Sequence, residues 1–360
     1  MSTAPFDSTT TLCGMTALRY YRTPPRYLGI CPPLPHEPSG SKYPELHAAP
    51  LATEVLKLPL HVLTDTQANR SQTAAFRHHV LNCELSFGSK RDTLHGFKVT
   101  SPELTLFTLS RMLTFNQLVM VAYEMCGRFT FFKPTPALDA ELTGRGLAEI
   151  ADGWSCVRDA KGKPTSQWMR PPLVTVSELK AFSSQIQGMR GAKLLSRAVD
   201  CVSGVCASPF EAQVSMLLWM PPALGGWGYR NFENNYPIRY SGEAQVLTGK
   251  TRAEVDLRVL SPNGMREKMI ECQGRSIHDR EGAGTKDALR ATALQSMGYN
   301  VTLVTYDQIE NIEKFEVLRQ MLTDGLGIEW AKKTPRQIAI ENKLRSEIFC
   351  DWLTFANEPV

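Results

Sequence analysis

The sequence lacks the cysteine spacing of a disulfide framework or a zinc site. Its nine cysteines are an odd number, no two of them form a CxxC pair, and several stand beside apolar residues. Such cysteines are typical of buried thiols in a reducing compartment. The first twenty residues contain no apolar signal segment, and no apolar run reaches the roughly 18 residues that a membrane helix needs. We therefore expect a cytoplasmic protein with no membrane partner.

The chain also lacks a strong charge of either sign. It has 40 basic and 36 acidic residues, which give a net charge of +4 over 360 residues. Residues 205–305 contain 11 Lys and Arg against 10 Asp and Glu. A nucleic-acid contact would therefore depend on basic side chains that folding brings together, because no bulk positive charge is present. The length allows two or three domains.

The most informative stretch covers residues 253–278, which have the pattern of two short strands. Polar and apolar residues alternate in both, with the period of two that half-buried strands show. Asn263-Gly264 between them is a strong hairpin signal. If these two residues form a two-residue turn, Asp256 lies directly opposite Glu271.

Two carboxylates in that position require a counter-charge. Directly opposed residues have Cβ atoms about 4.5–5.5 Å apart, and like charges there destabilise a sheet. Mg²⁺ is typically held by one or two carboxylates, with waters and substrate phosphates completing its shell, so Asp256 and Glu271 are a candidate metal site. Two alternatives remain open. The register can slip, since Pro262 cannot donate the hydrogen bond expected beside a tight turn, or Arg258 and Lys268 can neutralise the pair.

Helix signals surround this hairpin. Ser101-Pro102-Glu103 has the residues of a helix start, and Thr114 is a second cap. Prolines between residues 24 and 50 predict a linker or an extended segment, and residues 159–172 are predicted to be a loop. Further helices are expected over 177–187, 191–202 and 335–355. The last of these can pack beside the core or present a face to a partner.

Residues 208–322 predict the order helix, three strands, helix, strand, helix. Glu211 lies near the start of the first helix, three residues after Ser208. This is the spacing of a capping box, in which the carboxylate returns to the cap. The same carboxylate could instead face the hairpin and add a third acid to Asp256 and Glu271.

This αβββαβ order and these acids resemble the restriction-endonuclease-like PD-(D/E)XK superfamily. The segment ECQGRSIH, from Glu271 to His278, is similar to the branch that contains very-short-patch-repair-like endonuclease domains. The upstream segments SPELTLFTLSRML, CGRF and GMRGAKLLSRAV resemble abortive-infection antitoxin-like proteins. The resemblance implies an α/β (mixed α+β) chain, with a restriction-endonuclease-like core after a mainly helical α+β N-terminal region.

On this basis we divide the chain into five parts. They are an N-terminal arm and proline-rich linker (1–50), an α+β regulatory or recognition domain (51–173), a helical connector (174–204), a restriction-endonuclease-like domain (205–325) and a C-terminal helix (326–360).

The resemblance also implies roles for particular residues. Asp256 and Glu271 would bind Mg²⁺ or Mn²⁺ with the carbonyl of Cys272, Glu211 would support the metal or its water, and His278 would act as a general acid or base. Gln273 departs from the pattern, because the superfamily usually has lysine there and this branch aspartate. Glutamine can orient water but carries no charge; Lys268 or Lys286 could substitute. The candidate nucleic-acid contacts are Lys193, Arg197, Arg275, Lys286 and Arg290.

These expectations favour a metal-dependent nuclease that acts on DNA, in bacterial defence or repair. The alternative is a catalytically impaired nuclease-fold protein that serves as a DNA-binding regulator or antitoxin-like partner. A pure protein-interaction module, using the N-terminal region or the C-terminal helix, is a third hypothesis. A solvated face also accounts for Lys193 and Arg197, and Arg290 can either pair with Asp287 at helical spacing or reach the site.

Overall fold

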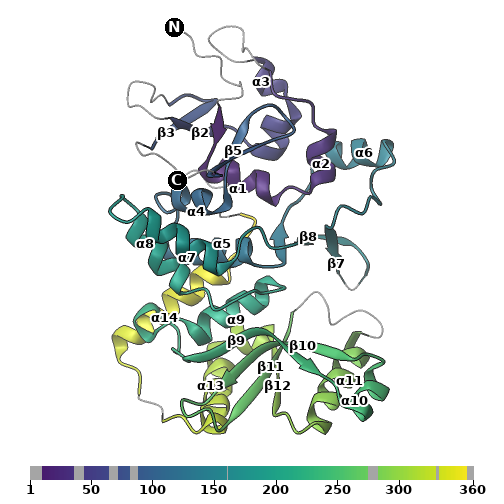
Figure 1. Cartoon of the computed structure of the whole chain (residues 1–360), viewed down its shortest axis with the longest axis vertical. Helices are drawn as coiled ribbons and strands as arrows, with labels where there is room; N and C mark the ends of the chain where they lie inside the picture. The colour runs from purple at the N-terminus through teal and green to yellow at the C-terminus, as the bar shows by residue number, and fades with distance from the viewer. Residues whose placement is uncertain are drawn as a thin grey trace.

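The computed structural model describes residues 10–35, 44–64, 72–81, 88–159, 161–274, 283–329 and 332–354, apart from the side chains of 283–287. Over these residues the chain is mixed α/β, as predicted, and its strands form three sheets. Figure 1 shows two of the sheets in the N-terminal half and the third in the C-terminal half. No helix among the described residues combines the length and hydropathy needed to cross a bilayer.

The first sheet has five strands in the order β3-β2-β1-β5-β4. Its strands are β1 (Thr11–Leu12), β2 (Leu60–Thr64), β3 (Phe76–Val80), β4 (Lys90–Asp92) and β5 (Lys98–Thr100). The prediction of an arm and linker over residues 1–50 is wrong for the described part, because β1 is the middle strand. The helices that accompany this sheet are α1 (Gly14–Arg22), α2 (Pro25–Ile30), α3 (Pro44–Ala48) and the π-helix η1 (Leu51–Leu56).

The prolines of this segment begin helices instead of preventing them. Pro25 and Pro44 occupy first helical positions, where the missing N–H has no partner to lose. Tyr27, Leu28 and Leu46 are buried in a common apolar core with β1. Burial of these side chains therefore outweighs the proline signal.

The second sheet has the order β6-β8-β7 and was not predicted. It consists of β6 (Phe129–Phe131), β7 (Ser155–Arg158) and β8 (Pro164–Met169), with α6 (Pro136–Gly144) between β6 and β7. The expected loop over 159–172 is wrong for its central part, because β8 occupies residues 164–169. Trp168 holds β8 in place: its side chain is buried, and its Nε1 donates to the carbonyl oxygen of Phe132 at 2.9 Å.

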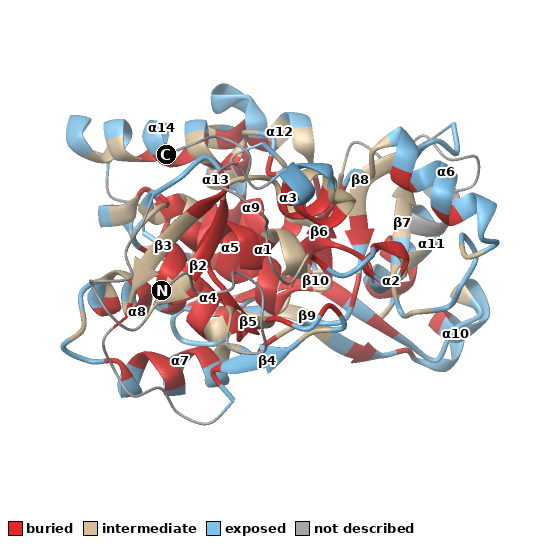
Figure 2. Cartoon of the chain, turned by 90° about the horizontal axis from the view of Figure 1, so that it is seen from above, coloured by how far each residue is buried: buried red, intermediate tan, exposed pale blue. Residues whose placement is uncertain are grey.

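The predicted helices between the sheets are present. They are α4 (Pro102–Leu109), α5 (Phe115–Cys126), α7 (Val176–Gln185) and α8 (Ala192–Asp200). Ser101 and Thr114 cap α4 and α5 as expected. Each side chain accepts the backbone N–H of the third residue of its helix. In Figure 2 the buried residues concentrate around α5 and α9, and exposed residues lie on α6, α10 and the outer side of α14.

The C-terminal half has the predicted order of elements with one short helix added. Its elements are α9 (Pro209–Trp219), the 3₁₀ helix η3 (Pro222–Leu224), β9 (Asn231–Arg239), the added α10 (Gly242–Thr248), β10 (Arg252–Leu260), β11 (Glu267–Gln273), α11 (Ala283–Ser296) and β12 (Val301–Thr305). The sheet order is β12-β11-β10-β9, with β11 and β12 parallel and the other neighbours antiparallel.

The helix predicted to follow the last strand, β12, is divided in two. It forms α12 (Tyr306–Glu310) and α13 (Ile312–Leu326), because Asn311 caps a new helix and its Oδ1 accepts the backbone N–H groups of Glu313 and Lys314. The C-terminal helix α14 (Pro335–Ile348) packs beside the core, since Leu344 and Ile348 are fully buried. The sequence left open whether this helix packs beside the core or presents a face to a partner. The structure shows that the side of α14 with Leu344 and Ile348 packs against the core.

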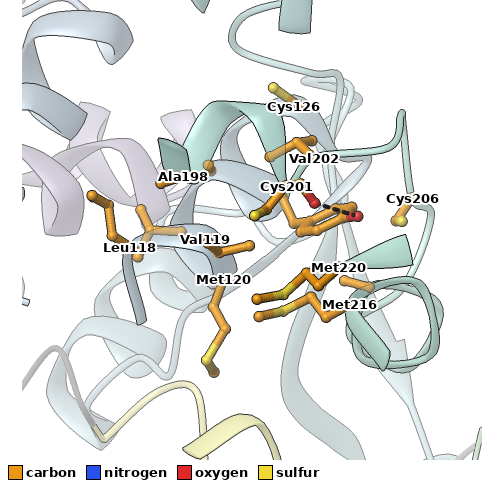
Figure 3. Packing of buried hydrophobic residues seen from close by; sticks show 14 of the residues in the cluster. Leu118, Val119, Met120, Cys126, Ala198, Cys201, Val202, Cys206, Met216 and Met220 are labelled. Atoms are coloured by element: carbon orange, nitrogen blue, oxygen red, sulfur yellow. Dashed lines mark hydrogen bonds between the residues drawn. The ribbon is translucent and has the colours of Figure 1, made fainter. Parts of the chain in front are cut away.

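One apolar core joins most of the chain. It contains Leu104 of α4, Leu217 of α9 and Ile348 of α14, so the predicted boundaries at residues 173, 204 and 325 do not separate independent cores. Figure 3 shows the centre of this core, where side chains of α5, α8 and α9 meet. The labelled residues include Leu118, Val119 and Met120 of α5, Ala198 of α8, and Met216 of α9.

A buried ion pair joins the first sheet's helices to this core. Arg22 of α1 donates from Nε and Nη2 to the two carboxylate oxygens of Glu124 in α5, at 2.8 and 2.6 Å. The two side chains are 4% and 1% exposed. Thr130 also donates to Glu124, at 2.7 Å. Removing one member of such a pair leaves the other charge buried without compensation.

We therefore expect Glu124→Ala to lower the free energy of unfolding by about 3–5 kcal/mol. The matched control is Glu141→Ala, which breaks the exposed ion pair between Arg145 and Glu141 and should cost less than about 1 kcal/mol. Urea denaturation of the two variants measures the difference. Equal costs for the two substitutions would contradict the role given to Glu124.

Candidate functional site

The hairpin of β10 and β11 has the predicted register. Leu257 pairs with Ile270 and Leu260 with Glu267, so the next position along the two strands brings Asp256 opposite Glu271. The turn is wider than predicted. The N–H of Ser261 donates to the carbonyl of Arg266 at 2.8 Å, which leaves Pro262–Met265 as the loop. The wider loop has the same centre as the predicted turn, so the register is unchanged, and Pro262 lies where no ladder hydrogen bond is required.

Asp256 interrupts the ladder at the site. Its Oδ2 accepts the backbone N–H of Cys272 at 2.7 Å, in a place where a strand carbonyl would normally be the acceptor. The carboxylate is thereby held against β11, next to Glu271. Both side chains are largely buried, with exposed fractions of 17% for Asp256 and 10% for Glu271.

Arg290 of α11 supplies the counter-charge for this pair. Its Nε donates to Glu271 Oε1 at 3.0 Å, and its Nη2 donates to Glu271 Oε2 and approaches Asp256 Oδ1 at 3.5 Å. Because Arg290 Nη2 contacts both carboxylates, the two acids lie on the same side of the sheet and beside one cation. Of the two options left open for Arg290, pairing with Asp287 or reaching the site, the structure shows contact with the acids of the site, and its contact with nucleic acid stays a prediction.

The cations proposed from the sequence as neutralising groups lie elsewhere. Arg258 pairs with Glu233 at 3.1 Å and with Glu267 at 2.8 Å. Lys268 donates to the side-chain oxygen of Asn300 at 2.9 Å. Burial lowers the pKa of Arg290, but the charges of Glu271 and Asp256 prevail and raise it, so the guanidinium stays charged.

Glu211 lines the cleft with Asp256 and Glu271, and its carboxylate does not close a capping box with Ser208. Ser208 Oγ accepts the backbone N–H of Glu211 at 3.1 Å, as in a helix cap, while Glu211 Oε2 accepts the N–H of Ala207 at 2.7 Å, one residue before the capping-box position. Burial and the nearby charge of Asp256 raise the pKa of Glu211 to about 8, against the lowering effect of the Ala207 and Ser208 hydrogen bonds. Near neutral pH this carboxyl is therefore mostly protonated.

These groups line one cleft of about 460 Å³. On one side it is lined by the predicted residues Glu211, Asp256, Glu271, Cys272, Gln273 and Arg290. On the other side it is lined by Phe131 of β6, Gln167 and Met169 of β8, and Asp351 and Trp352 after α14. Sequence reasoning missed this second wall. The signal that could have found it is the turn sequence from Asp159 to Gly162 between β7 and β8.

The cleft carries more acidic than basic groups. Its described lining includes the three acids of the first wall and Asp351, against the single cation Arg290. A bound phosphate would therefore need additional positive charge, which a divalent ion could supply.

The donor set fits a two-carboxylate magnesium site better than a closed protein cage. No group of three or more His, Cys, Asp or Glu side chains that could hold a metal occurs among the residues the structure describes. Asp256 and Glu271 provide two hard oxygen ligands, and Mg²⁺ commonly fills the remaining positions with water and substrate. The Cys272 side chain packs against the main core, and burial raises its thiol pKa well above the usual value, so its sulfur is a poor ligand.

Of the remaining predicted residues, two do not line the cleft, and for the other three the position or the side chain is not described. Arg275 and His278 lie outside the described residues, and Lys286 falls in α11 at a position whose side chain is not described. Lys193 and Arg197 belong to α8 and are absent from the cleft lining. The guanidinium of Arg197 instead lies 5.3 Å from the ring centre of Phe115.

Comparisons with known proteins identify no relative for this arrangement. No protein-family model matches the sequence, and neither a curated protein nor a solved structure matches it.

The pKa of Glu211 leads to a pH prediction. A carboxyl raised from 4.5 to about 8 by folding favours the folded state while it is protonated, so its contribution is present below about pH 4.5 and is lost as the pH rises through about 8. We expect the free energy of unfolding of the metal-free protein to fall with pH over this window. Glu211→Gln, which keeps an oxygen for the Ala207 N–H but cannot ionise, should show a flatter profile. Parallel profiles in urea titrations at several pH values would rule out this role.

Proposed function

We propose that the protein is a metal-dependent nuclease that hydrolyses phosphodiester bonds, with DNA as the expected substrate. The observation that supports this most directly is the contact of Asp256 and Glu271, from adjacent strands, with a single cation inside a cleft. Glu211 and Gln273 line the same cleft. The order of elements from α9 to β12 agrees with the αβββαβ order of the restriction-endonuclease-like superfamily.

The residues of the cleft suit the parts of this reaction. A Mg²⁺ or Mn²⁺ ion held by Asp256 and Glu271 would lower the pKa of a bound water and offset charge on the attacked phosphate. In the metal-free protein, burial and the charge of Asp256 raise the pKa of Glu211 to about 8, so it can hold a proton near neutral pH; a bound cation would lower this pKa and favour release of the proton. Gln273 can orient a water through its amide group.

Apolar groups shape the rest of the cleft. The rings of Phe210 and Tyr306 lie 5.4 Å apart, and both residues line the cavity with Leu303. Such walls reduce competing water around the carboxylates, and the face of the half-buried Tyr306 ring could stack against a nucleobase.

The direct test is nuclease activity in Mg²⁺ or Mn²⁺ on single-stranded, duplex and mismatched DNA and on RNA. Asp256→Asn should lower the cleavage rate by about 100-fold or more, because it removes a ligand that acts on charge developing in the transition state. The matched control is Glu254→Gln on the same strand, since Glu254 pairs with Arg128 and does not line the cleft.

Equal rates for Asp256→Asn and the wild type would exclude this site as the catalytic centre. The absence of a metal-dependent product from the wild type on all four substrates would exclude the nuclease itself.

A second function is favoured by two observations at the same site. Arg290 lies against the carboxylates where an ion would bind, and Gln273 carries no charge where the resembling superfamily usually has lysine. Both features are expected in a nuclease fold with impaired catalysis that acts as a DNA-binding regulator or antitoxin-like partner. Such a protein should bind DNA with strong salt dependence and without producing cleavage.

Gln273→Lys separates the two functions. If the site binds metal and phosphate, a lysine at this position should raise the cleavage rate by about tenfold or more, because it stabilises charge on the attacked phosphate. Gln167→Lys, on the opposite wall of the cleft, is the control for a general gain of positive charge. An unchanged rate with Gln273→Lys, together with DNA binding that weakens steeply with salt, would favour the regulator.

A further inference from the structure

The guanidinium of Arg290 and a divalent ion would use the same oxygen atoms. Nη2 of Arg290 contacts Glu271 Oε2 and Asp256 Oδ1, one oxygen of each carboxylate. An Mg²⁺ ion bridging these acids would need ligand distances of about 2.0–2.1 Å, which leaves no room for a nitrogen at hydrogen-bond distance between them. Binding of the metal and this arrangement of Arg290 therefore exclude each other.

Arg290 has a second anchor that does not depend on the acids. Its Nη2 also donates to the backbone carbonyl oxygen of Glu254, at 2.7 Å. The Arg290 side chain is 34% exposed, compared with 10% for Glu271, so it is the more solvent-accessible member of this pair.

The charge arrangement gives Arg290 a role before metal arrives. Opposed carboxylates on neighbouring strands repel each other, and without a cation their repulsion would act on the hairpin at the point where Asp256 replaces a ladder acceptor. The guanidinium offsets this repulsion in the metal-free protein. Every divalent ion that binds must then displace it.

We propose that Arg290 is a positioning residue that holds Asp256 and Glu271 together in the metal-free protein and exchanges with the divalent ion. This inference rests on the proposed metal site and adds a competition between an internal cation and the metal. The site then has two alternating occupants, and its affinity for metal is set by how readily Arg290 leaves.

The test is Mn²⁺ binding without nucleic acid, measured by titration calorimetry and by the electron paramagnetic resonance signal of free Mn²⁺. We expect Arg290→Gln to bind Mn²⁺ on the order of tenfold more tightly than the wild type, since a charge-assisted hydrogen bond no longer has to be broken. Arg258→Gln is the matched control, because Arg258 is an ion-paired arginine on the same sheet that does not contact the acid pair. Its Mn²⁺ affinity should equal that of the wild type.

Thermal unfolding provides the readout that a purely structural role would not reproduce. Arg290→Gln should lower the melting temperature without metal, and saturating Mn²⁺ should restore it to the metal-bound wild-type value. The double variant Arg290→Gln, Asp256→Asn should lose the gain in Mn²⁺ affinity. If Arg290→Gln fails to fold without metal, Arg290→Lys keeps one positive charge and should give an intermediate affinity.

The outcomes distinguish this inference from the proposed function. Equal or weaker Mn²⁺ binding by Arg290→Gln overturns the exchange, even if the wild type cleaves DNA. Tighter Mn²⁺ binding by Arg290→Gln supports the exchange, even if neither protein cleaves nucleic acid. Mn²⁺ binding by neither protein overturns both.

Discussion

The opposition of two carboxylates across neighbouring strands is the constraint on which the candidate site depends. Asp256 and Glu271 face each other because the register of β10 and β11 requires it, and their repulsion has to be offset by a cation. In the structure that cation is Arg290, which draws α11 toward the strands through contacts with both acids and with the carbonyl of Glu254. The proton on Glu211 reduces the remaining charge, because burial next to Asp256 raises its pKa. The negative charge of the acid cluster is thus offset by a cation of the same chain.

The large shared core gives this cluster its second wall. Figure 1 shows α9 and α14 between the N-terminal helices and the C-terminal sheet, and α9 carries Glu211 into the cleft. The buried pair of Arg22 and Glu124 fixes α5, against which α9 packs. Trp352, which follows α14, contacts the rings of Phe129 and Phe131 and so places the chain end against β6. Residues of β6, β8, α9 and the segment after α14 therefore line the cleft together with the acids.

The same features agree with the proposed nuclease and with the alternative of a nuclease fold with impaired catalysis. The two proposals differ in which cation neutralises the acids. A phosphodiester approaching this cleft meets several acids, so a cation must be present for it to bind. In the proposed nuclease, the arginine that neutralises the acids in the metal-free protein would compete with the divalent ion. Gln273 adds no charge to the site. On this proposal, the exchange of cations would govern the chemistry of the site more than the shape of the cleft.

The sequence by itself determined the local features of this protein. The alternation of residues 253–259 and the turn residues around Gly264 were sufficient to predict the pairing of β10 with β11, because register depends on neighbours along two adjacent strands. The caps at Ser101 and Thr114 were also predictable, because a helix cap depends only on residues within the first helical turn. Only the tertiary structure decided which cation meets the acids, since the sequence favoured Arg258 and Lys268 of the hairpin, and packing brings Arg290 of α11 to the acids instead. It also decided that residues 11–12 form a central strand and that Met169 and Trp352 line the same cleft as the acids, because these contacts join segments far apart in the chain.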